Sequence, residues 1–259
     1  MTPLGLFTGE RALVTGSASN IGRGIALALA SEGATVVLAD IDMERNAAVA
    51  RDIGTAGGSA ETISVDLSQP DAWKDLVSQV ETRLPHMLVH AACPRRLEAD
   101  TALTVSEGTW DAMLATNVRS GFFLGRELGN RMREAGIRGR ILYITSLHSS
   151  TPRNLPHYSA AKAGMTMVTK ELARALGPAG IRVNALAPGA VPGGGAANMD
   201  ASFEPRRKIP LQRYGTPEDM AQMAIALLSD RFSGYVTGVT VPVDGGLALF
   251  NWIDMPGQG

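Results

Sequence analysis

A tyrosine and a lysine stand four positions apart, as Tyr158 and Lys162, shortly after the turn residues Pro152 and Pro156. Residues with this spacing share one face of a helix, so the phenol and the ammonium can point into the same space. A free tyrosine holds its proton too tightly to act as a base near neutral pH, but a neighbouring positive charge favours the phenolate. The pair is therefore suited to general acid/base chemistry on a hydroxyl or carbonyl group.

A turn of small residues lies near the N-terminus, between an apolar run at Arg11–Thr15 and a stretch of helical periodicity at Ile21–Glu32. Small residues allow the backbone to approach a pyrophosphate closely, and the following helix N-terminus supplies N–H groups and a positive dipole. A strand, a glycine-rich turn and a helix in this order predict a dinucleotide site. Its expected contacts are Gly16, Ser19, Asn20, Ile21 and Gly22.

Asp40 ends the next expected strand, where a carboxylate can accept hydrogen bonds from the adenine ribose hydroxyls. The same carboxylate would repel a 2′-phosphate, and the following residues, Ile41 and Asp42, provide no cation to bind one. The alternative is a strand end that only faces solvent. We predict that the cofactor is NAD rather than NADP.

The chain that must position these residues alternates short apolar runs with longer stretches of helical periodicity. Further strands are expected at Ala34–Asp40, Glu61–Asp66, Met87–Ala91, Gly139–Ser146, Gly180–Ala187 and Thr237–Val241. Further helices are expected at about 43–55, 70–83, 107–134, 156–177 and 217–229. Several runs, such as Thr35–Ala39, are apolar throughout, as a parallel sheet covered on both faces requires. The predicted fold class is α/β, a Rossmann-like doubly wound parallel sheet with helices on both faces.

No repeat, charge block or linker divides the chain, so we expect one domain over residues 1–259. The least regular stretch is Pro188–Pro205, which contains a run of three glycines beginning at Gly193. It is long for a connection in a compact domain, and such segments often cover a functional site. We expect a flexible substrate lid at about residues 189–205.

The composition excludes several classes of protein. Hydrophobic residues make up 45% and charged residues 19%, which is typical of a globular chain. The net charge of −1 argues against a surface for nucleic acid or anionic membranes. One cysteine excludes an internal disulfide framework, and the four histidines lack the paired spacing of a metal site. We see no signal peptide and no apolar run of about 18 residues, so the expected compartment is the cytoplasm.

Together these features resemble the short-chain dehydrogenase/reductase family, and the resemblance covers essentially the whole chain. Tyr158 and Lys162 match the Tyr-x-x-x-Lys motif of that family. Ser146 matches its catalytic serine, and Asn117 matches the helix asparagine that holds a water in its proton relay. The resemblance implies hydride transfer between a nicotinamide cofactor and an alcohol or carbonyl. Tyr158 would exchange the hydroxyl proton, Ser146 would bind the substrate oxygen, and Lys162 would bind the nicotinamide ribose.

The resemblance also implies cofactor contacts outside the glycine-rich turn. They are Asp66, Leu67, Ala91, Tyr158, Lys162, Pro188, Gly189 and Val191. Three positions depart from the family pattern. Asn20 stands for the middle glycine of the turn, residues 90–93 read His-Ala-Ala-Cys instead of Asn-Asn-Ala-Gly, and Gly193 stands for a threonine. Asparagine tolerates left-handed geometry, so we expect the turn to survive, whereas the contacts made by residues 90–93 are in doubt.

The expected substrate-binding residues are Ser146 and Tyr158 from the motif, together with His148 and Arg153. We also expect Ser149, His157, Arg95 and Arg96 on the substrate side. These types would make a polar, partly cationic pocket for a sugar, a polyol or a sugar acid. The alternative is that the arginines are solvated loop residues. Cys93 is expected to be a small buried residue rather than a nucleophile.

We therefore predict an NAD(H)-dependent oxidoreductase that interconverts a secondary alcohol and its ketone. Two alternatives are a 3-oxoacyl-thioester reductase and a catalytically idle dinucleotide-binding sensor on the same fold. The resemblance implies a homotetramer in which Asp111–Arg133 and His157–Leu176 pair between subunits. An apolar tail carrying Leu247, Leu249, Phe250, Trp252 and Ile253 would pack on a neighbouring subunit. No nucleic-acid partner is expected.

Overall fold

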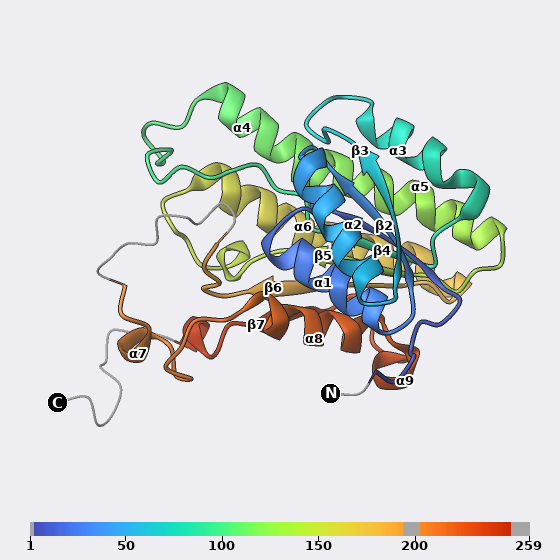
Figure 1. Ribbon diagram of the computed structural model, residues 1–259. Coiled ribbons are helices and arrows are strands. Elements are labelled where there is room, and N and C mark those ends of the chain that lie inside the picture. The colour runs from blue at the N-terminus through green and yellow to red at the C-terminus, as the bar shows by residue number, and fades with distance from the viewer. Residues whose placement is uncertain (1–2, 194–202, 250–259) are drawn as a thin grey trace.

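The computed structural model describes residues 3–193 and 203–249, and its centre is a seven-stranded sheet in which every strand is parallel (Figure 1). The strands are β1 (Arg11–Thr15), β2 (Thr35–Asp40), β3 (Ser59–Ser64), β4 (Met87–His90), β5 (Arg140–Ile144), β6 (Arg182–Pro188) and β7 (Thr240–Val243). Their order across the sheet is β3-β2-β1-β4-β5-β6-β7. The chain therefore winds outward in both directions from β1 and β4, as the predicted doubly wound fold requires.

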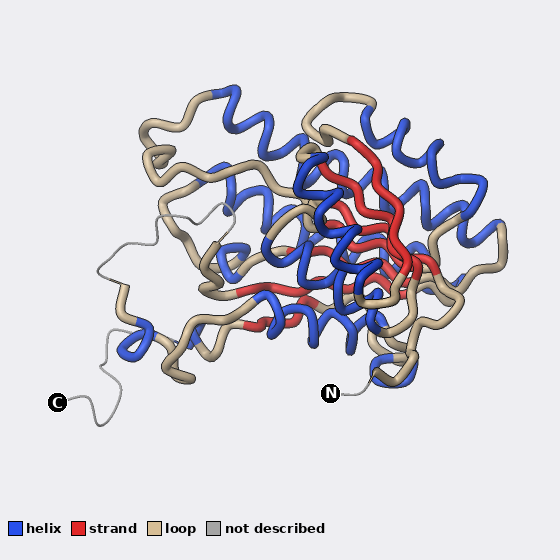
Figure 2. Tube along the Cα trace, in the orientation of Figure 1, coloured by secondary structure: helices blue, strands red, loops and turns tan. Residues whose placement is uncertain are grey.

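Helices cover both faces of the sheet (Figure 2). The longer ones are α1 (Asn20–Ser31), α2 (Met43–Thr55), α3 (Ala72–Val80), α4 (Glu107–Leu114), α5 (Ser120–Glu134), α6 (Pro156–Leu176) and α8 (Pro217–Leu228). Two short helices, α7 (Pro205–Lys208) and α9 (Asp230–Ser233), follow β6 and α8 and were not expected from the sequence. Helices of one turn carry too little periodicity to be predicted.

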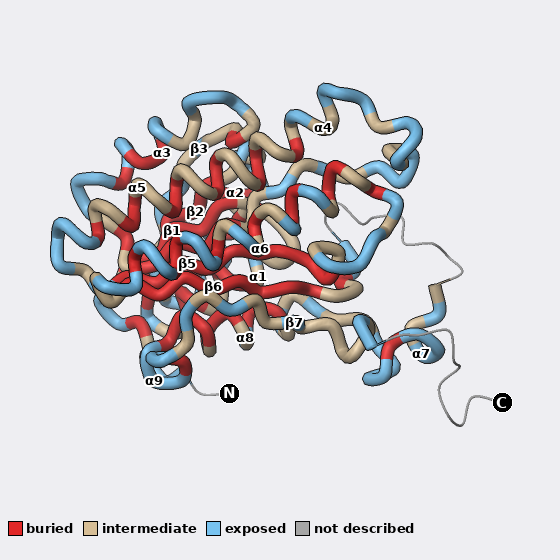
Figure 3. The backbone as a smooth tube through the Cα atoms, turned by 180° about the vertical axis from the view of Figure 1, so that it is seen from behind, coloured by how far each residue is buried: buried red, intermediate tan, exposed pale blue. Residues whose placement is uncertain are grey.

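The core consists of two apolar layers, one on each face of the sheet. Alternate strand residues point to opposite layers, so that Val36 packs with α1, α2 and α8 while Val37 packs with α3, α5 and α6. This is the reason that the strands read as continuous apolar runs. Figure 3 shows the result, with buried strands at the centre and exposed residues along the outer sides of the helices.

Several element predictions differ from the structure. The strand expected at Thr237–Val241 begins three residues later, as β7 at Thr240, and other bounds shift by one to three residues. The expected strand Glu61–Asp66 begins two residues earlier, at Ser59, because β3 is an exposed edge strand with little apolar patterning. The single helix expected over residues 107–134 is interrupted by a π-helical turn, Ala115–Arg119, between α4 and α5. Hydrophobic periodicity does not reveal such a turn, because it inserts one residue without breaking the helical rod.

Other predictions fall partly outside the described residues. Residues 194–202 of the expected lid lie there, as do Phe250, Trp252 and Ile253 of the apolar tail, so both remain predictions. The expectation of one domain also remains a prediction. Among the described residues, no helix is both long and apolar enough to cross a membrane.

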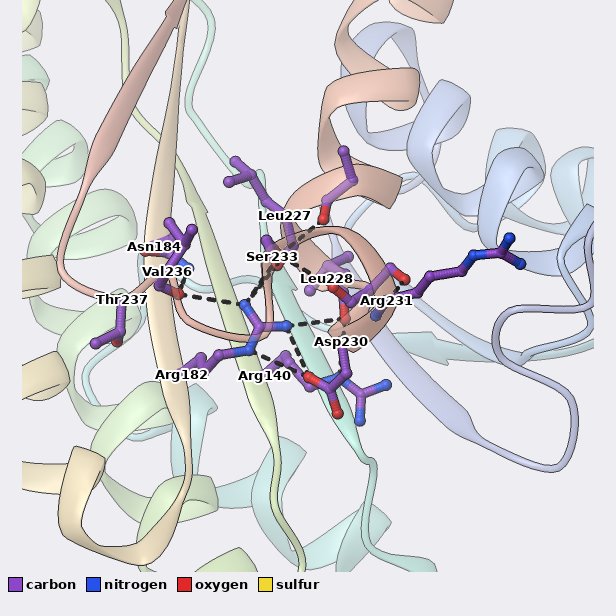
Figure 4. A network of polar contacts seen from close by, with 12 residues as sticks. Arg140, Arg182, Asn184, Leu227, Leu228, Asp230, Arg231, Ser233, Val236 and Thr237 are labelled. Carbon is purple, nitrogen blue, oxygen red and sulfur yellow. Dashed lines mark hydrogen bonds and ion pairs between the residues drawn. The ribbon is translucent and has the colours of Figure 1, made fainter.

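Arg182, on β6, connects the sheet to the end of α8 and to the segment before β7 (Figure 4). Its side chain is only 8% exposed, and its guanidinium donates to the carbonyls of Leu227 at 2.8 Å, Leu228 at 3.3 Å and Val236 at 3.3 Å. It also pairs with the exposed carboxylate of Asp230 at 3.0 Å. A single guanidinium thus satisfies carbonyls at the end of α8 and before β7.

Replacing Arg182 with methionine should destabilise the protein by about 2–4 kcal/mol, because three carbonyls each lose a charged donor and keep only their second one, from Ser233, Arg140 or Asn184. Asp230→Asn should cost less than about 1 kcal/mol, since that carboxylate is exposed and water replaces the ion pair. Urea unfolding of the two variants measures both values. Equal decreases in the free energy of unfolding for the two variants would show that the ion pair, rather than the carbonyl contacts, accounts for the stabilisation by Arg182.

Candidate active site

A cavity of about 680 Å³ opens at the carboxyl ends of the central strands. This is the edge at which parallel doubly wound sheets bind ligands, where the winding reverses between β1 and β4. Segments that follow β1, β2, β4, β5 and β6 contribute to its wall. The predicted residues that line it are Gly16, Ser19, Asn20, Ile21, Gly22, Asp40, Ala91, Ser146, His148, Arg153, Tyr158, Lys162, Pro188, Gly189 and Val191.

The turn after β1 has the shape of a backbone cradle. Gly16 has a φ of +69°, and a Cβ atom there would lie 2.6 Å from the backbone nitrogen of Ala92. A Cβ on Gly22 would collide with the carbonyl oxygen of Gly16. Asn20 adopts a φ of 46°, so asparagine does take the left-handed geometry expected of it.

The first turn of α1 is left open to an anion. Ser19 is the N-cap residue, but its side chain makes no capping hydrogen bond, and no acidic residue stands in the first turn. The backbone N–H groups there and the helix dipole are therefore available to a phosphate group. Close backbone approach and an uncapped helix N-terminus fit the pyrophosphate of a dinucleotide.

Asp40 lines the cavity at the same end, and local backbone groups hold its carboxylate in place. Oδ2 accepts a hydrogen bond from Ala18 N at 2.9 Å, and Oδ1 accepts one from Asp42 N at 3.0 Å. Each carboxylate oxygen has a second lone pair for another donor. The side chain is thus fixed beside the glycine-rich turn rather than free in solvent.

Two of the predicted cofactor residues lie outside the cavity wall. Leu67 is 4% exposed, and the Asp66 carboxylate is used by its own turn, where Ser68 Oγ donates to Oδ1 at 2.7 Å. That hydrogen bond lowers the pKa of Asp66. Contact between these residues and an adenine ring remains a prediction.

The two hydroxyl groups of the predicted catalytic set come from different elements. Ser146 follows β5, where its Oγ accepts a hydrogen bond from His148 N at 3.2 Å. Tyr158 lies in the first turn of α6, after Pro156 has started that helix. Both side chains line the cavity although each residue is less than 10% exposed. The structure therefore brings both residues to the same cavity.

Lys162 is buried one turn further along α6. Its Nζ donates to Asn117 Oδ1 at 2.7 Å and to the carbonyl of Ile144 at 2.8 Å. An ammonium has three N–H donors, so one remains for a ligand in the cavity. Nζ also lies 5.6 Å from the centroid of the Tyr158 ring, which places the cation beside the phenol as the i, i+4 spacing predicts.

Asn117 does not line the cavity but supports the lysine from behind. It lies in the π-helical turn, where its Nδ2 donates to the carbonyl of Met113 at 3.0 Å. This bond orients the amide so that Oδ1 faces Lys162. Such π turns occur frequently at functional sites. The direct contact between Asn117 and Lys162 was not foreseen, because the family pattern implies only a water held by the asparagine.

His90 is a residue whose role the sequence did not reveal. It ends β4, is 3% exposed, and connects Thr15 Oγ1 at 2.9 Å with the carbonyl of Thr116 at 3.1 Å. A carbonyl can only accept, so Nε2 carries the proton and Nδ1 accepts from the Thr15 hydroxyl. Burial, with a smaller contribution from the charge on Lys162, lowers the pKa of His90 to about 4.

This imidazole therefore links two segments by hydrogen bonds. One is the end of β1, directly before the glycine-rich turn, and the other is the π-helical turn that contains Asn117. The signal for it was the departure from the family pattern at residues 90–93, where a histidine replaces an asparagine. Asparagine and neutral histidine can each donate and accept a hydrogen bond, so a histidine at this position can still link two segments, over a longer distance.

The structure separates the residues expected on the substrate side into two groups. His148, Arg153 and Arg96 line the cavity, whereas Ser149, Arg95 and His157 do not. His157 is fully buried, and neither of its ring nitrogens has a hydrogen-bond partner among the described residues.

The cavity wall also contains residues that the sequence did not single out for it. Among them are Cys93, Pro94, Glu98, Thr151 and Lys208, while Phe203 lines it from the expected lid segment. The expectation that Cys93 is buried is wrong, because its side chain is exposed in the segment that leaves β4. Position after the carboxyl end of a central strand was the signal that could have identified this segment.

Known proteins are similar to this chain over most of its length. The family profile described as "Enoyl-(Acyl carrier protein) reductase" matches residues 16–248. A human (3R)-3-hydroxyacyl-CoA dehydrogenase is 33% identical over 251 residues, which cover 92% of this chain and 95% of that protein. Glucose 1-dehydrogenase 2 of Bacillus subtilis is 34% identical over 263 residues, covering 94% of this chain and 96% of that protein.

Among solved structures, one similar chain is a putative NAD(P)-dependent gluconate 5-dehydrogenase from Beutenbergia cavernae with bound NADP at low occupancy. It superposes with a TM-score of 0.88 and 34% sequence identity. The match covers 96% of this chain and 99% of that one. These similarities extend over nearly the whole fold rather than over a single motif.

His90 should make the protein acid-sensitive. Its pKa is about 4 in the folded protein but near 6.5 when unfolded, so between these values only the unfolded chain binds the proton. Stability should therefore fall as pH drops from about 6.5 to 4, by about 3 kcal/mol from this residue alone. His90→Asn removes the effect, so its stability relative to wild type should rise by that amount over the same interval.

Urea unfolding at pH 7, 5.5 and 4 measures the difference. His86→Asn serves as the matched control, because its imidazole accepts from Arg11 N at 3.1 Å but does not contact the π-helical turn. A constant difference between wild type and His90→Asn across this range would show that His90 is not held neutral by its site.

Proposed function

The chain belongs to the short-chain dehydrogenase/reductase family, and we propose that it interconverts a secondary alcohol and its ketone with NAD(H) as the hydride carrier. The observation that carries the proposal is the constellation at the cavity wall. It combines two hydroxyl-bearing residues of the same cavity with a buried ammonium beside the phenol. A protein that only sensed dinucleotides would have no need of this arrangement.

The roles follow from the contacts of each group. Ser146 and Tyr158 both reach the cavity, so their hydroxyls can hold one substrate oxygen between them. Tyr158 takes the proton from that oxygen during oxidation and returns it during reduction. Lys162 keeps a positive charge beside the phenol and has one N–H left for the ribose of the cofactor. When bound, the nicotinamide ring supplies the acceptor or donor of the hydride.

The preference for NAD is supported by Asp40. Its carboxylate is fixed at the cofactor end of the cavity by backbone N–H groups of Ala18 and Asp42. A negative charge held there accepts hydrogen bonds from ribose hydroxyls and opposes a 2′-phosphate. The Beutenbergia relative holds NADP, so this residue, rather than family membership, is the basis of the proposal.

We propose a polyhydroxylated substrate, that is, a sugar, a polyol or a sugar acid. The substrate half of the cavity presents polar and charged groups, among them His148, Arg153 and Arg96. Two of the relatives are named for glucose and gluconate. The competing candidate is a 3-oxoacyl-thioester reductase, which the human relative named for 3-hydroxyacyl-CoA favours.

The proposal of a homotetramer that pairs through α5 and α6 rests on family resemblance, as does that of a cytoplasmic location. Neither is needed for the chemistry above, because each group named there comes from one chain.

A substrate panel with purified protein tests the proposed reaction. Polyols, aldoses, sugar acids, hydroxysteroids and 3-hydroxyacyl thioesters are each incubated with NAD and with NADP, and reduced cofactor is followed by absorbance. Turnover of a polyhydroxylated substrate with NAD is expected. Tyr158→Phe should retain less than about 1% of that turnover, because general acid/base catalysis contributes about 100-fold or more.

Tyr235→Phe is the matched control, since that tyrosine is fully exposed and should lose nothing. Oxidation of the 3-hydroxyacyl thioesters with NADP, without turnover of the sugars, would support the reductase instead. Equal turnover by Tyr158→Phe and wild type would remove Tyr158 from the reaction.

Asp40→Asn should shift the choice of cofactor. The variant keeps the shape of the side chain but loses its charge, so the ratio of kcat/KM for NADP to that for NAD should rise about 10- to 100-fold. Asp42→Asn is the control, because asparagine still caps α2 and Asp42 does not line the cavity. An equal decrease in kcat/KM with NAD and with NADP would mean that Asp40 only stabilises the glycine-rich turn.

A further inference from the structure

The substrate half of the cavity carries more positive than negative side chains. The cations that line it are Arg96, Arg153 and Lys208, and the carboxylate on that side is Glu98. Asp40 also lines the cavity but is held at the other end, beside the glycine-rich turn. The question is which of the three cations is left for a ligand.

Two of the cations are poor candidates. Arg153 donates to Glu98 Oε1 at 2.8 Å, so its charge is already compensated. Lys208 is exposed on the short helix α7, where its Nζ lies 5.6 Å from the Phe203 ring centroid. A hydrated ammonium on a flexible stem is a weak and unselective anion site.

Arg96 differs from both. It is half-buried, and its guanidinium carbon lies 4.3 Å from the centroid of the Tyr158 ring. Within the part of the chain that the structure describes, no carboxylate lies within 4.0 Å of its nitrogens. A guanidinium without an ion-pair partner among the described residues therefore lies over the ring of Tyr158, whose hydroxyl is proposed to exchange a proton with the reacting oxygen.

The position over the ring determines how this cation can bind. A cation–π contact with Tyr158 holds the guanidinium in place. Its N–H donors make no hydrogen bond or ion pair with another described residue, so they remain available. That fork of donors matches the two oxygens of a carboxylate and orients it more strictly than an ammonium can.

His148 indicates a second group that the ligand carries, a hydroxyl. Its Nδ1 lies 3.0 Å from the carbonyl of Thr151, so Nδ1 carries the proton and Nε2 is left as an acceptor in the neutral ring. Burial lowers the pKa of His148, which favours the neutral form near pH 7. A ring that lines the cavity in this state accepts a hydrogen bond from a hydroxyl group.

We propose that Arg96 binds the carboxylate of a hydroxy acid, and that the substrate carries this carboxylate close to the carbon whose hydroxyl contacts Tyr158. The inference rests on the proposed alcohol oxidation and narrows its substrate to an acid. A neutral polyol leaves the Arg96 charge unpaired. An acyl thioester presents an uncharged thioester carbonyl near its reacting carbon, and its phosphates lie many bonds away.

The test compares acids with neutral partners of matched shape. Gluconate is paired with glucitol and 3-hydroxybutyrate with its methyl ester, and kcat/KM is measured with NAD for wild type and variants. In Arg96→Gln, kcat/KM for the acid that wild type prefers should fall about 10- to 100-fold, mainly through KM. The neutral partner should lose less than the acid, so the ratio of the two kcat/KM values should fall about tenfold or more, because the charge beside Tyr158 acts on both substrates and the carboxylate contact only on the acid. Circular dichroism shows that the variant is folded.

Two further variants sharpen the result. Arg96→Lys should fall between wild type and Arg96→Gln, since it keeps the charge but loses the fork. Arg95→Gln is the matched control, because Arg95 is exposed, adjacent in sequence and does not line the cavity. Equal losses for acid and neutral partner in Arg96→Gln, or equal effects of Arg95→Gln and Arg96→Gln, would overturn the assignment.

Calorimetric titration with the same acids separates this inference from the proposed reaction. Binding that weakens at least tenfold in Arg96→Gln, without turnover of any alcohol, would support the anion site and overturn the proposed oxidation. Turnover of neutral alcohols by wild type, with acid binding that Arg96→Gln leaves unchanged, would overturn the anion site and leave the oxidation standing.

Discussion

A buried ammonium needs oxygen acceptors to replace water, and Lys162 obtains them from two separate parts of the fold. Asn117 supplies a side-chain oxygen from the π-helical turn, and Ile144 supplies a backbone carbonyl from the end of β5. Either oxygen alone would leave the charge poorly solvated. The site therefore requires that α6, β5 and the junction of α4 and α5 keep their relative positions.

Those positions are in turn fixed by the parallel sheet. Because parallel strands end at one common edge, the turns after β1, β4 and β5 meet there without any sequence proximity. His90 strengthens this meeting point, since its neutral ring connects Thr15 behind the glycine-rich turn to Thr116 in the π-helical turn. The cofactor cradle and the lysine support are thus parts of one hydrogen-bonded structure rather than two adjacent ones.

The cavity has two halves with opposite electrostatic character. At the cofactor end, the open N-terminus of α1 suits a phosphate group, and the fixed carboxylate of Asp40 suits the hydroxyls of a ribose. At the other end, the Arg96 guanidinium lies over the Tyr158 ring, while Glu98 forms an ion pair with Arg153. Arg96 lies over the Tyr158 ring, so the residue proposed to exchange the proton is in contact with the residue proposed to select the substrate.

Much of this could be predicted from the sequence, because the relevant signals are local. The i, i+4 pair of Tyr158 and Lys162 depends only on helical geometry, and the turn that contains Gly16 and Gly22 depends only on the absence of side chains. Continuous apolar strands likewise predicted a sheet covered on both faces, and the observed parallel sheet has that form.

The remaining features are contacts between segments distant in sequence, which no local pattern encodes. Glu98 could pair with Arg153 and leave Arg96 free only once the segment after β4 lay beside the segment after β5. The direct bond from Lys162 to Asn117 required a π-helical turn that hydrophobic periodicity does not reveal. Residue types and helical spacing thus determined the chemistry available to this chain, whereas tertiary packing decided which charges are compensated and which remain to bind a substrate.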